Sequence, residues 1–119
     1  MTTFLAVAAG GALGAVGRTI VIGRVGAWLG TGFPYGTLLV NVAGSFLLGL
    51  VVAIAADRTV DDHLLLFLGA GVLGGFTTFS TFALDVAYLA GRHARPAAAL
   101  YVAASVVLSI GAFAAGLAL

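Results

Sequence analysis

Residues 74–82 read Gly74-Gly75-Phe76-Thr77-Thr78-Phe79-Ser80-Thr81-Phe82 and lie near the middle of an apolar segment that runs from about 64 to 90. As one unbroken helix, that segment would measure about 40 Å, whereas the hydrocarbon core of a bilayer is roughly 30 Å thick. Each glycine of the pair costs about 1 kcal/mol in helix propensity. The hydroxyl side chains that follow can bond the backbone of an unwound turn. We therefore predict a helix that breaks at mid-membrane depth, near residues 74–78.

The whole chain has the composition of a small integral membrane protein. Hydrophobic residues make up 62% of its 119 residues and charged residues 8%, whereas soluble domains have about 45–50% and about 25%. The absence of Cys excludes a disulfide scaffold, a thiolate metal site and a cysteine nucleophile. A formal net charge of +1 is too small for a nucleic-acid-binding surface, so we expect no nucleic-acid partner.

Charged residues divide the chain into four apolar segments, each long enough for a spanning helix of about 20 residues. We predict an all-α membrane protein with one four-helix transmembrane domain over residues 1–119. The predicted spans lie near residues 3–24, 35–56, 64–90 and 97–118. The loops contain His63 and His93, which we expect to be solvated, because neither has a second metal ligand at helical spacing.

The arginines are distributed unevenly between the two ends of such a bundle. Arg24, Arg92 and Arg95 belong to one end, whereas Arg58 alone belongs to the other. The positive-inside rule then favours an orientation with both termini outside. The bias amounts to a few residues, which also permits insertion in both orientations.

Two of the predicted spans carry polar side chains at helical spacing. Asn41, the single carboxamide of the chain, lies in the second span and shares a stripe with Thr37, Gly44 and Ser45. Asn41 either forms a hydrogen bond between helices, which typically contributes about 0.6 kcal/mol to stability, or presents an amide N–H to a permeating anion. In the last span, three hydroxyl residues at i, i+4 and i+8 predict a polar track: Tyr101, Ser105 and Ser109.

Phenyl groups and two charged residues complete the candidate site. Phe79 and Phe82, three residues apart, either pack in the core or turn the positive edges of their rings toward a small anion. For Arg18 we favour a vestibule or structural role, because an arginine near a helix end can extend its side chain to the membrane interface. Asp85, on the same side of the helix as Phe82, either pairs with an arginine or caps a polar track.

The predicted break also has ion-binding chemistry. Freed backbone carbonyls favour a cation, whereas helix N-termini and hydroxyl donors favour an anion. A plain helix-packing seam of small residues is the alternative for a Gly-Gly pair. No nucleophile–base pair and no phosphate-binding glycine loop is present in the sequence, so we expect no enzymatic activity.

Together these motifs resemble the CrcB/Fluc family of fluoride channels over nearly the whole chain. The first motif is Gly10-Gly11-Ala12-Leu13-Gly14-Ala15 with Arg18, and the second runs from Gly36-Thr37-Leu38 through Asn41 to Gly44 and Ser45. The third and most specific motif is residues 74–82. Tyr101, Ser105 and Ser109 are similar to the family's polar face on the fourth helix.

The resemblance implies a passive, fluoride-selective channel that releases cytoplasmic fluoride, built as an antiparallel, dual-topology homodimer with two pores in the prokaryotic inner membrane. It implies that Asn41 is the pore carboxamide and that Phe79 and Phe82 form the phenyl pair, contributed across the subunits. The polar track would comprise Ser80, Thr81, Tyr101, Ser105 and Ser109. A structural sodium ion (Na+) at the dimer centre would be held by the backbone carbonyls of Gly74 and Thr77. Arg18 would be the arginine near the end of the first helix.

Two other functions compete with this interpretation. A small multidrug-type transporter that exchanges protons for cationic compounds also has four helices, but the chain has no Glu and offers only Asp85 as an acid beside the membrane interior. A structural or assembly subunit would use all of these polar residues to join helices. The partners expected for the channel are the fluoride ion, a second copy of the chain and the lipid bilayer.

Overall fold

The structure, a computed structural model, describes residues 2–30, 32–56, 61–92 and 94–119. Its elements are all helical: α1 (Thr2–Leu29), α2 (Tyr35–Ala56), α3 (Asp62–Leu66), η1 (Phe67–Leu73), α4 (Gly74–Phe76), α5 (Phe79–Gly91) and α6 (Arg95–Ala118). The segment η1 is a π-helix. Two of the predicted loop residues, Arg58 and His93, lie outside the described residues.

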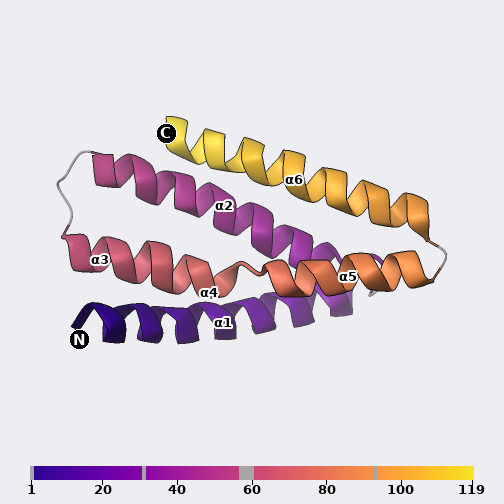
Figure 1. Cartoon of the computed structure of the whole chain (residues 1–119), viewed down its shortest axis with the longest axis horizontal. Helices are drawn as coiled ribbons and strands as arrows, with labels where there is room; N and C mark the ends of the chain where they lie inside the picture. Colours follow the sequence, from indigo (N-terminus) through magenta and orange to yellow (C-terminus); the bar gives the residue numbers. More distant parts are fainter. Residues whose placement is uncertain (1, 31, 57–60, 93) are drawn as a thin grey trace.

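Four stretches are long and apolar enough to cross a membrane, and the third comprises α3, η1, α4 and α5 in succession. The predicted all-α membrane architecture with a broken third helix is thus confirmed, and the chain is a multi-pass integral membrane protein. Both termini of the described chain lie at the same end of the bundle, as four antiparallel crossings require (Figure 1). The inverted homodimer stays a prediction.

The first helix is longer than the predicted span 3–24, because α1 continues past Arg24 to Leu29. Gly30 then adopts a φ of 82°, a left-handed conformation that glycine accepts without strain, and the helix ends there. Arg24 is exposed near this end, so the helix can include it without burying its charge. The second helix begins at Tyr35 and ends at Ala56, the residues predicted for it.

Close glycine contacts hold the helices together. A Cβ placed on Gly14 of α1 would collide with the Val72 carbonyl oxygen, and one on Gly116 of α6 would collide with the Phe46 carbonyl oxygen of α2. In a membrane, where lipid competes for apolar contact, such small residues allow helix backbones to approach closely. The α1–η1 and α2–α6 interfaces therefore fix the scaffold around the break.

Most of the large apolar side chains face away from the single chain. Trp28 is 80% exposed, Phe79 is 79% exposed and Phe4 is 69% exposed. Exposed apolar surface on this scale is typical of a chain surrounded by lipid or by a partner. A small core of Leu89, Ala98 and Tyr101 lies between α5 and α6.

Candidate functional site

The third transmembrane stretch breaks at two extended residues. Thr77 has φ −81° and ψ 155°, and Thr78 has φ −150° and ψ 123°. Hydroxyl groups stabilise both sides of the break: Thr77 Oγ1 donates to the Leu73 carbonyl oxygen at 3.0 Å, and Thr81 N–H donates to Thr78 Oγ1 at 3.2 Å. Thr78 thereby caps the N-terminus of α5, which is the local chemistry that lets these residues leave the helix.

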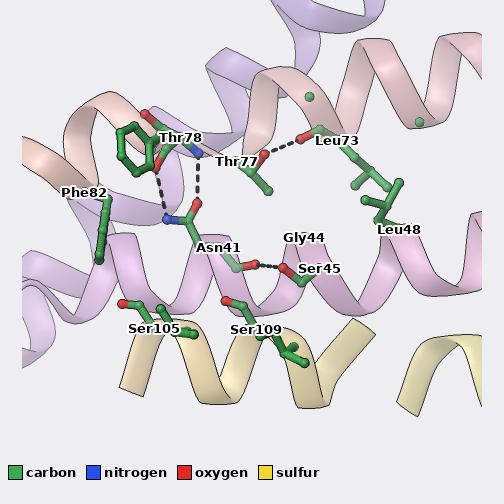
Figure 2. A pocket seen from close by; sticks show the side chains of 15 residues that line it. Asn41, Gly44, Ser45, Leu48, Leu73, Thr77, Thr78, Phe82, Ser105 and Ser109 are labelled. Carbon is green, nitrogen blue, oxygen red and sulfur yellow. Dashed lines mark hydrogen bonds between the residues drawn. The ribbon is translucent and has the colours of Figure 1, made fainter. Parts of the chain in front are cut away.

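Asn41 of α2 binds the break directly. Its Oδ1 accepts the Thr78 N–H at 2.8 Å, and its Nδ2 donates to the Thr78 carbonyl oxygen at 3.1 Å. One carboxamide thus satisfies both backbone groups of an extended residue, as a neighbouring strand would (Figure 2). The second hydrogen of Nδ2 is not needed for this pairing and remains for another acceptor.

A cavity of about 480 Å³ adjoins this pair, between α2, the broken helix and α6. Its polar atoms come from amide, hydroxyl and backbone groups, and each of the described lining residues is uncharged. Figure 2 shows Ser105 and Ser109 on α6 opposite Asn41 and the break. The lining consists of Asn41, Gly44, Ser45, Leu48, Gly69, Leu73, Gly74, Thr77, Thr78, Phe79, Phe82, Ser105, Val106, Ser109 and Ile110.

Ser105 carries an unpaired hydroxyl group at this cavity. Its side chain is 7% exposed, and its Oγ has no hydrogen-bond partner within the described part of the chain. Leaving a buried hydroxyl unpaired costs about 1–3 kcal/mol, so Ser105 carries a donor that the described part of the chain does not satisfy. Ser45, by contrast, is satisfied, because its Oγ donates to the Asn41 carbonyl oxygen at 2.7 Å.

Aromatic rings close one side of the cavity. The Phe79 and Phe82 centroids lie 5.8 Å apart at an interplanar angle of 44°, and Phe82 lies 5.1 Å from the Tyr101 ring. Phe82 is partly buried, whereas Phe79 projects from the chain. The pair therefore belongs partly to the packed core and partly to a surface that the single chain leaves open.

Tyr101 is fully buried and is not among the residues that line the cavity. The Tyr101 O–H donates to Asp85 Oδ2 at 3.1 Å, and the ring meets Phe33 edge-on at 5.6 Å. Among the described residues, no arginine lies within ion-pairing distance of Asp85. Of the two roles considered for Asp85, the geometry therefore favours a contact with the track hydroxyl of Tyr101.

Residues 5–117 match the model of a family described as "CrcB-like protein, Camphor Resistance (CrcB)". The chain belongs to the CrcB family. This membership confirms the resemblance drawn from the sequence motifs, and the family is one of ion channels rather than enzymes.

Several relatives of this CrcB chain are named "Fluoride-specific ion channel FluC". The protein from Rhodospirillum centenum is 54% identical over 100% of this chain and 95% of its own length. The one from Chelativorans sp. is 52% identical over 98% of this chain and 94% of its own length. The one from Nitrobacter winogradskyi is 50% identical over 98% of this chain and 93% of its own length. The similarity thus extends over all four spans.

The structure places the predicted site residues of this CrcB chain in different surroundings. It brings together Asn41, Phe79, Phe82, Ser105, Ser109, Gly74 and Thr77 at the cavity. Ser80, Thr81, Tyr101, Asp85 and Arg18 are not among the residues that line it. Ser80 Oγ lies 3.2 Å from Thr78 Oγ1, so it still adjoins the break, and Arg18 is half-buried on α1.

Thr78 is a polar residue of the CrcB site to which the sequence motifs assign no role of its own. It lies within the quoted stretch, but its role depends on Asn41, which is 37 positions away. The sequence does contain a signal for this pairing. It has a single carboxamide and one predicted helix break, and the polar groups of both need hydrogen-bond partners inside a membrane.

Proposed function

We propose that this chain is a passive, fluoride-selective channel that lets cytoplasmic fluoride leave the cell. The observation that carries the proposal is the cavity at the break, whose described lining presents neutral donors and phenyl groups and no charge. Family membership and the names of the relatives support the same function. The multidrug-type alternative has no support from these relatives.

The chemistry of the lining suits a small anion that must lose water. Fluoride is compact and accepts strong hydrogen bonds, so the pore has to replace its hydration with equally compact donors. The Asn41 amide, the unpaired Ser105 hydroxyl and the neighbouring Ser109 hydroxyl are donors of this kind. Neutral dipoles hold the ion weakly enough for it to leave again, which a fixed positive charge would prevent.

The exposed Phe79 ring supports the inverted homodimer as the functional unit. Phe79 is 79% exposed beside a polar cavity, and a second copy related by a two-fold axis in the membrane would cover both the ring and the cavity. The edge of each ring would then face a pore built by both chains. Two copies of the cavity would form two pores.

The break also suits the proposed Na+. In an uninterrupted helix, the Gly74 carbonyl would accept the Thr78 N–H and the Thr77 carbonyl would accept the Thr81 N–H. Here Thr78 N–H donates to Asn41, and Thr81 N–H donates to Thr78 Oγ1. The two carbonyls are therefore released, and such carbonyls are the ligands that unwound membrane helices use for Na+. Two from each copy would surround one ion at the two-fold axis.

The function is tested by fluoride release from proteoliposomes. We expect vesicles loaded with potassium fluoride to release fluoride rapidly once valinomycin balances the charge, as measured with a fluoride electrode. Vesicles loaded with potassium chloride should release chloride much more slowly, because chloride is larger and accepts weaker hydrogen bonds. Vesicles that hold the same salt but no protein serve as the control. Equal rates of fluoride and chloride release would refute the proposed selectivity.

The Na+ site is tested by changing the cation at constant ionic strength. We expect the purified channel to unfold at a higher temperature in sodium gluconate than in N-methylglucamine gluconate, because a bound ion stabilises the folded form. Potassium gluconate is the matched comparison that separates a site for Na+ from a site for any cation, because carbonyl ligands can bind the larger potassium ion too. Identical unfolding temperatures in all three salts would argue against a bound cation.

Ser105→Ala separates a pore hydroxyl from a packing residue. We expect fluoride efflux to fall about tenfold, because one donor along the path is lost. We expect stability to rise by about 1 kcal/mol, because a buried, unpaired hydroxyl has been removed. Ser45→Ala is the matched control: its hydroxyl is already bonded, so its loss should lower stability slightly and affect flux less. Wild-type flux in Ser105→Ala would exclude Ser105 from the path.

A further inference from the structure

One end of the molecule is basic and aromatic. It is the end at which α1 and α5 finish and α6 begins, on the right of Figure 1. Exposed there are Arg24, Trp28, Tyr88, Arg92 and Arg95; we call this set the basic end. The exposed acids Asp61 and Asp62 lie at the opposite end, where α3 begins.

Within the basic end, Tyr88 and Arg92 form a preorganised pair. Arg92 Nη1 donates to the Tyr88 hydroxyl oxygen at 3.2 Å, and the Arg92 guanidinium carbon lies 5.1 Å from the centre of the Tyr88 ring. Stacking and one hydrogen bond orient the guanidinium while leaving most of its N–H groups, and the Tyr88 O–H, for an outside acceptor. Among the described residues, no carboxylate lies within ion-pairing distance of Arg92.

Such a pair matches a phosphodiester. A planar guanidinium can give two parallel hydrogen bonds to two phosphate oxygens, and a neighbouring hydroxyl can give a third. Arg95 follows three residues later and adds a second exposed positive charge, at the start of α6. The geometry is therefore suited to a phosphate group that carries a net negative charge.

The surroundings indicate where that phosphate is located. Trp28 is 80% exposed and Tyr88 is 56% exposed at the end of apolar, membrane-long helices. Amphipathic rings in this position lie at the level of the lipid headgroups, where the phosphates are. A dissolved anion would make no use of these rings, whereas a lipid brings acyl chains to cover them.

We propose that the basic end is a binding surface for anionic phospholipids, with the Tyr88–Arg92 pair on the headgroup phosphate and Arg95 contributing to the selection of net negative lipids. An arginine near an anionic surface strengthens binding about fivefold, so the preference over zwitterionic lipid arises from several additive contacts. In an inverted dimer, each membrane face would carry one such surface. The proposal does not depend on which ion the protein conducts.

The test uses the full-length protein, purified in detergent and titrated with phosphatidylglycerol or with phosphatidylcholine of the same acyl chains. Lipid adducts are counted by native mass spectrometry. We expect phosphatidylglycerol to be retained at least fivefold more strongly, and Arg92→Gln/Arg95→Gln to remove that preference. Arg92→Lys should retain only part of it, because an ammonium keeps the charge but not the planar fork.

Asp61→Asn/Asp62→Asn is the matched control, since it changes two charges at the opposite end and Asn preserves the cap at the start of α3. We expect this variant to retain the preference for phosphatidylglycerol. An equal loss there would overturn the proposal, because it would indicate net charge rather than a local surface. Equal retention of both lipids by the wild type would also overturn the proposal. Displacement of phosphatidylglycerol by millimolar inorganic phosphate would overturn it as well.

A fold control distinguishes a damaged protein from a lost surface. The unfolding temperature of Arg92→Gln/Arg95→Gln in phosphatidylcholine should equal that of the wild type, because both side chains are exposed. If the Arg and the Asp variants instead dissociated the dimer to the same extent, the acidic end of a second copy would be the true occupant and the lipid proposal would fail.

Discussion

Asn41→Asp is expected to reduce fluoride efflux from proteoliposomes by about 100-fold or more. The substitution places a negative charge at a cavity whose described lining is otherwise neutral, directly beside the proposed path. At 4 Å and an effective dielectric constant of 20, two like charges repel by about 4 kcal/mol, whereas a tenfold change corresponds to about 1.4 kcal/mol. Efflux is measured with a fluoride electrode at equal amounts of reconstituted protein.

The same substitution also alters the pairing with Thr78, so a second variant is needed. An aspartate can still accept the Thr78 N–H but cannot donate to the Thr78 carbonyl oxygen. Asn41→Ala removes both hydrogen bonds without adding charge, and we expect it to lose about 1–3 kcal/mol of stability. Its flux should therefore lie between those of the wild type and Asn41→Asp. Unchanged flux in a folded Asn41→Asp protein would show that Asn41 serves only to hold the break.

The break itself was predictable because its causes are local. Two glycines and a run of hydroxyl residues lower helix propensity and supply substitute partners, and both effects act within a few positions of the chain. The extended residues Thr77 and Thr78 fall inside the predicted interval. Local chemistry likewise explains why the second helix begins at Tyr35, directly after Pro34.

The π-helix before the break was not predictable in this way. The segment η1 contains Gly69 and Gly71, which lower helix propensity but do not specify π-helical winding. In the folded chain, Gly71 packs against Gly10 with its prospective Cβ 3.0 Å from the Gly10 Cα. The altered winding thus coincides with a contact between segments far apart in sequence, which a local sequence pattern does not show.

The position of the Tyr101 hydroxyl could not be predicted from helical spacing. The i, i+4 and i+8 spacing of Tyr101, Ser105 and Ser109 predicts one polar face, and both serines do line the cavity. A tyrosine hydroxyl, however, lies a full ring beyond its Cβ, and here the ring packs against Phe82 and carries the O–H to Asp85. Helical spacing locates a Cβ atom but not the end of a long side chain.

Gly116→Ala is expected to lower the stability of the folded protein. A Cβ at Gly116 would collide with the Phe46 carbonyl oxygen and lie 3.0 Å from the Leu50 nitrogen, and backbone atoms cannot move aside as a flexible side chain can. Overpacking of this kind costs about 1–3 kcal/mol. Thermal unfolding in detergent measures the effect, and fluoride efflux should fall with it, because α6 carries Ser105 and Ser109 to the cavity.

Gly111→Ala is the matched control, because it makes the same substitution on the same helix at a position with nothing within 4 Å. Gly49 of α2 forms the other side of the tight contact, and its Cβ would meet the Phe113 carbonyl oxygen. Once either methyl group has pushed the helices apart, the second has less left to disrupt, so Gly49→Ala/Gly116→Ala should cost less than the sum of the single variants. Equal unfolding temperatures for Gly116→Ala and Gly111→Ala would mean that α2 and α6 are not held by this close approach. The position of the serine donors would then require another cause.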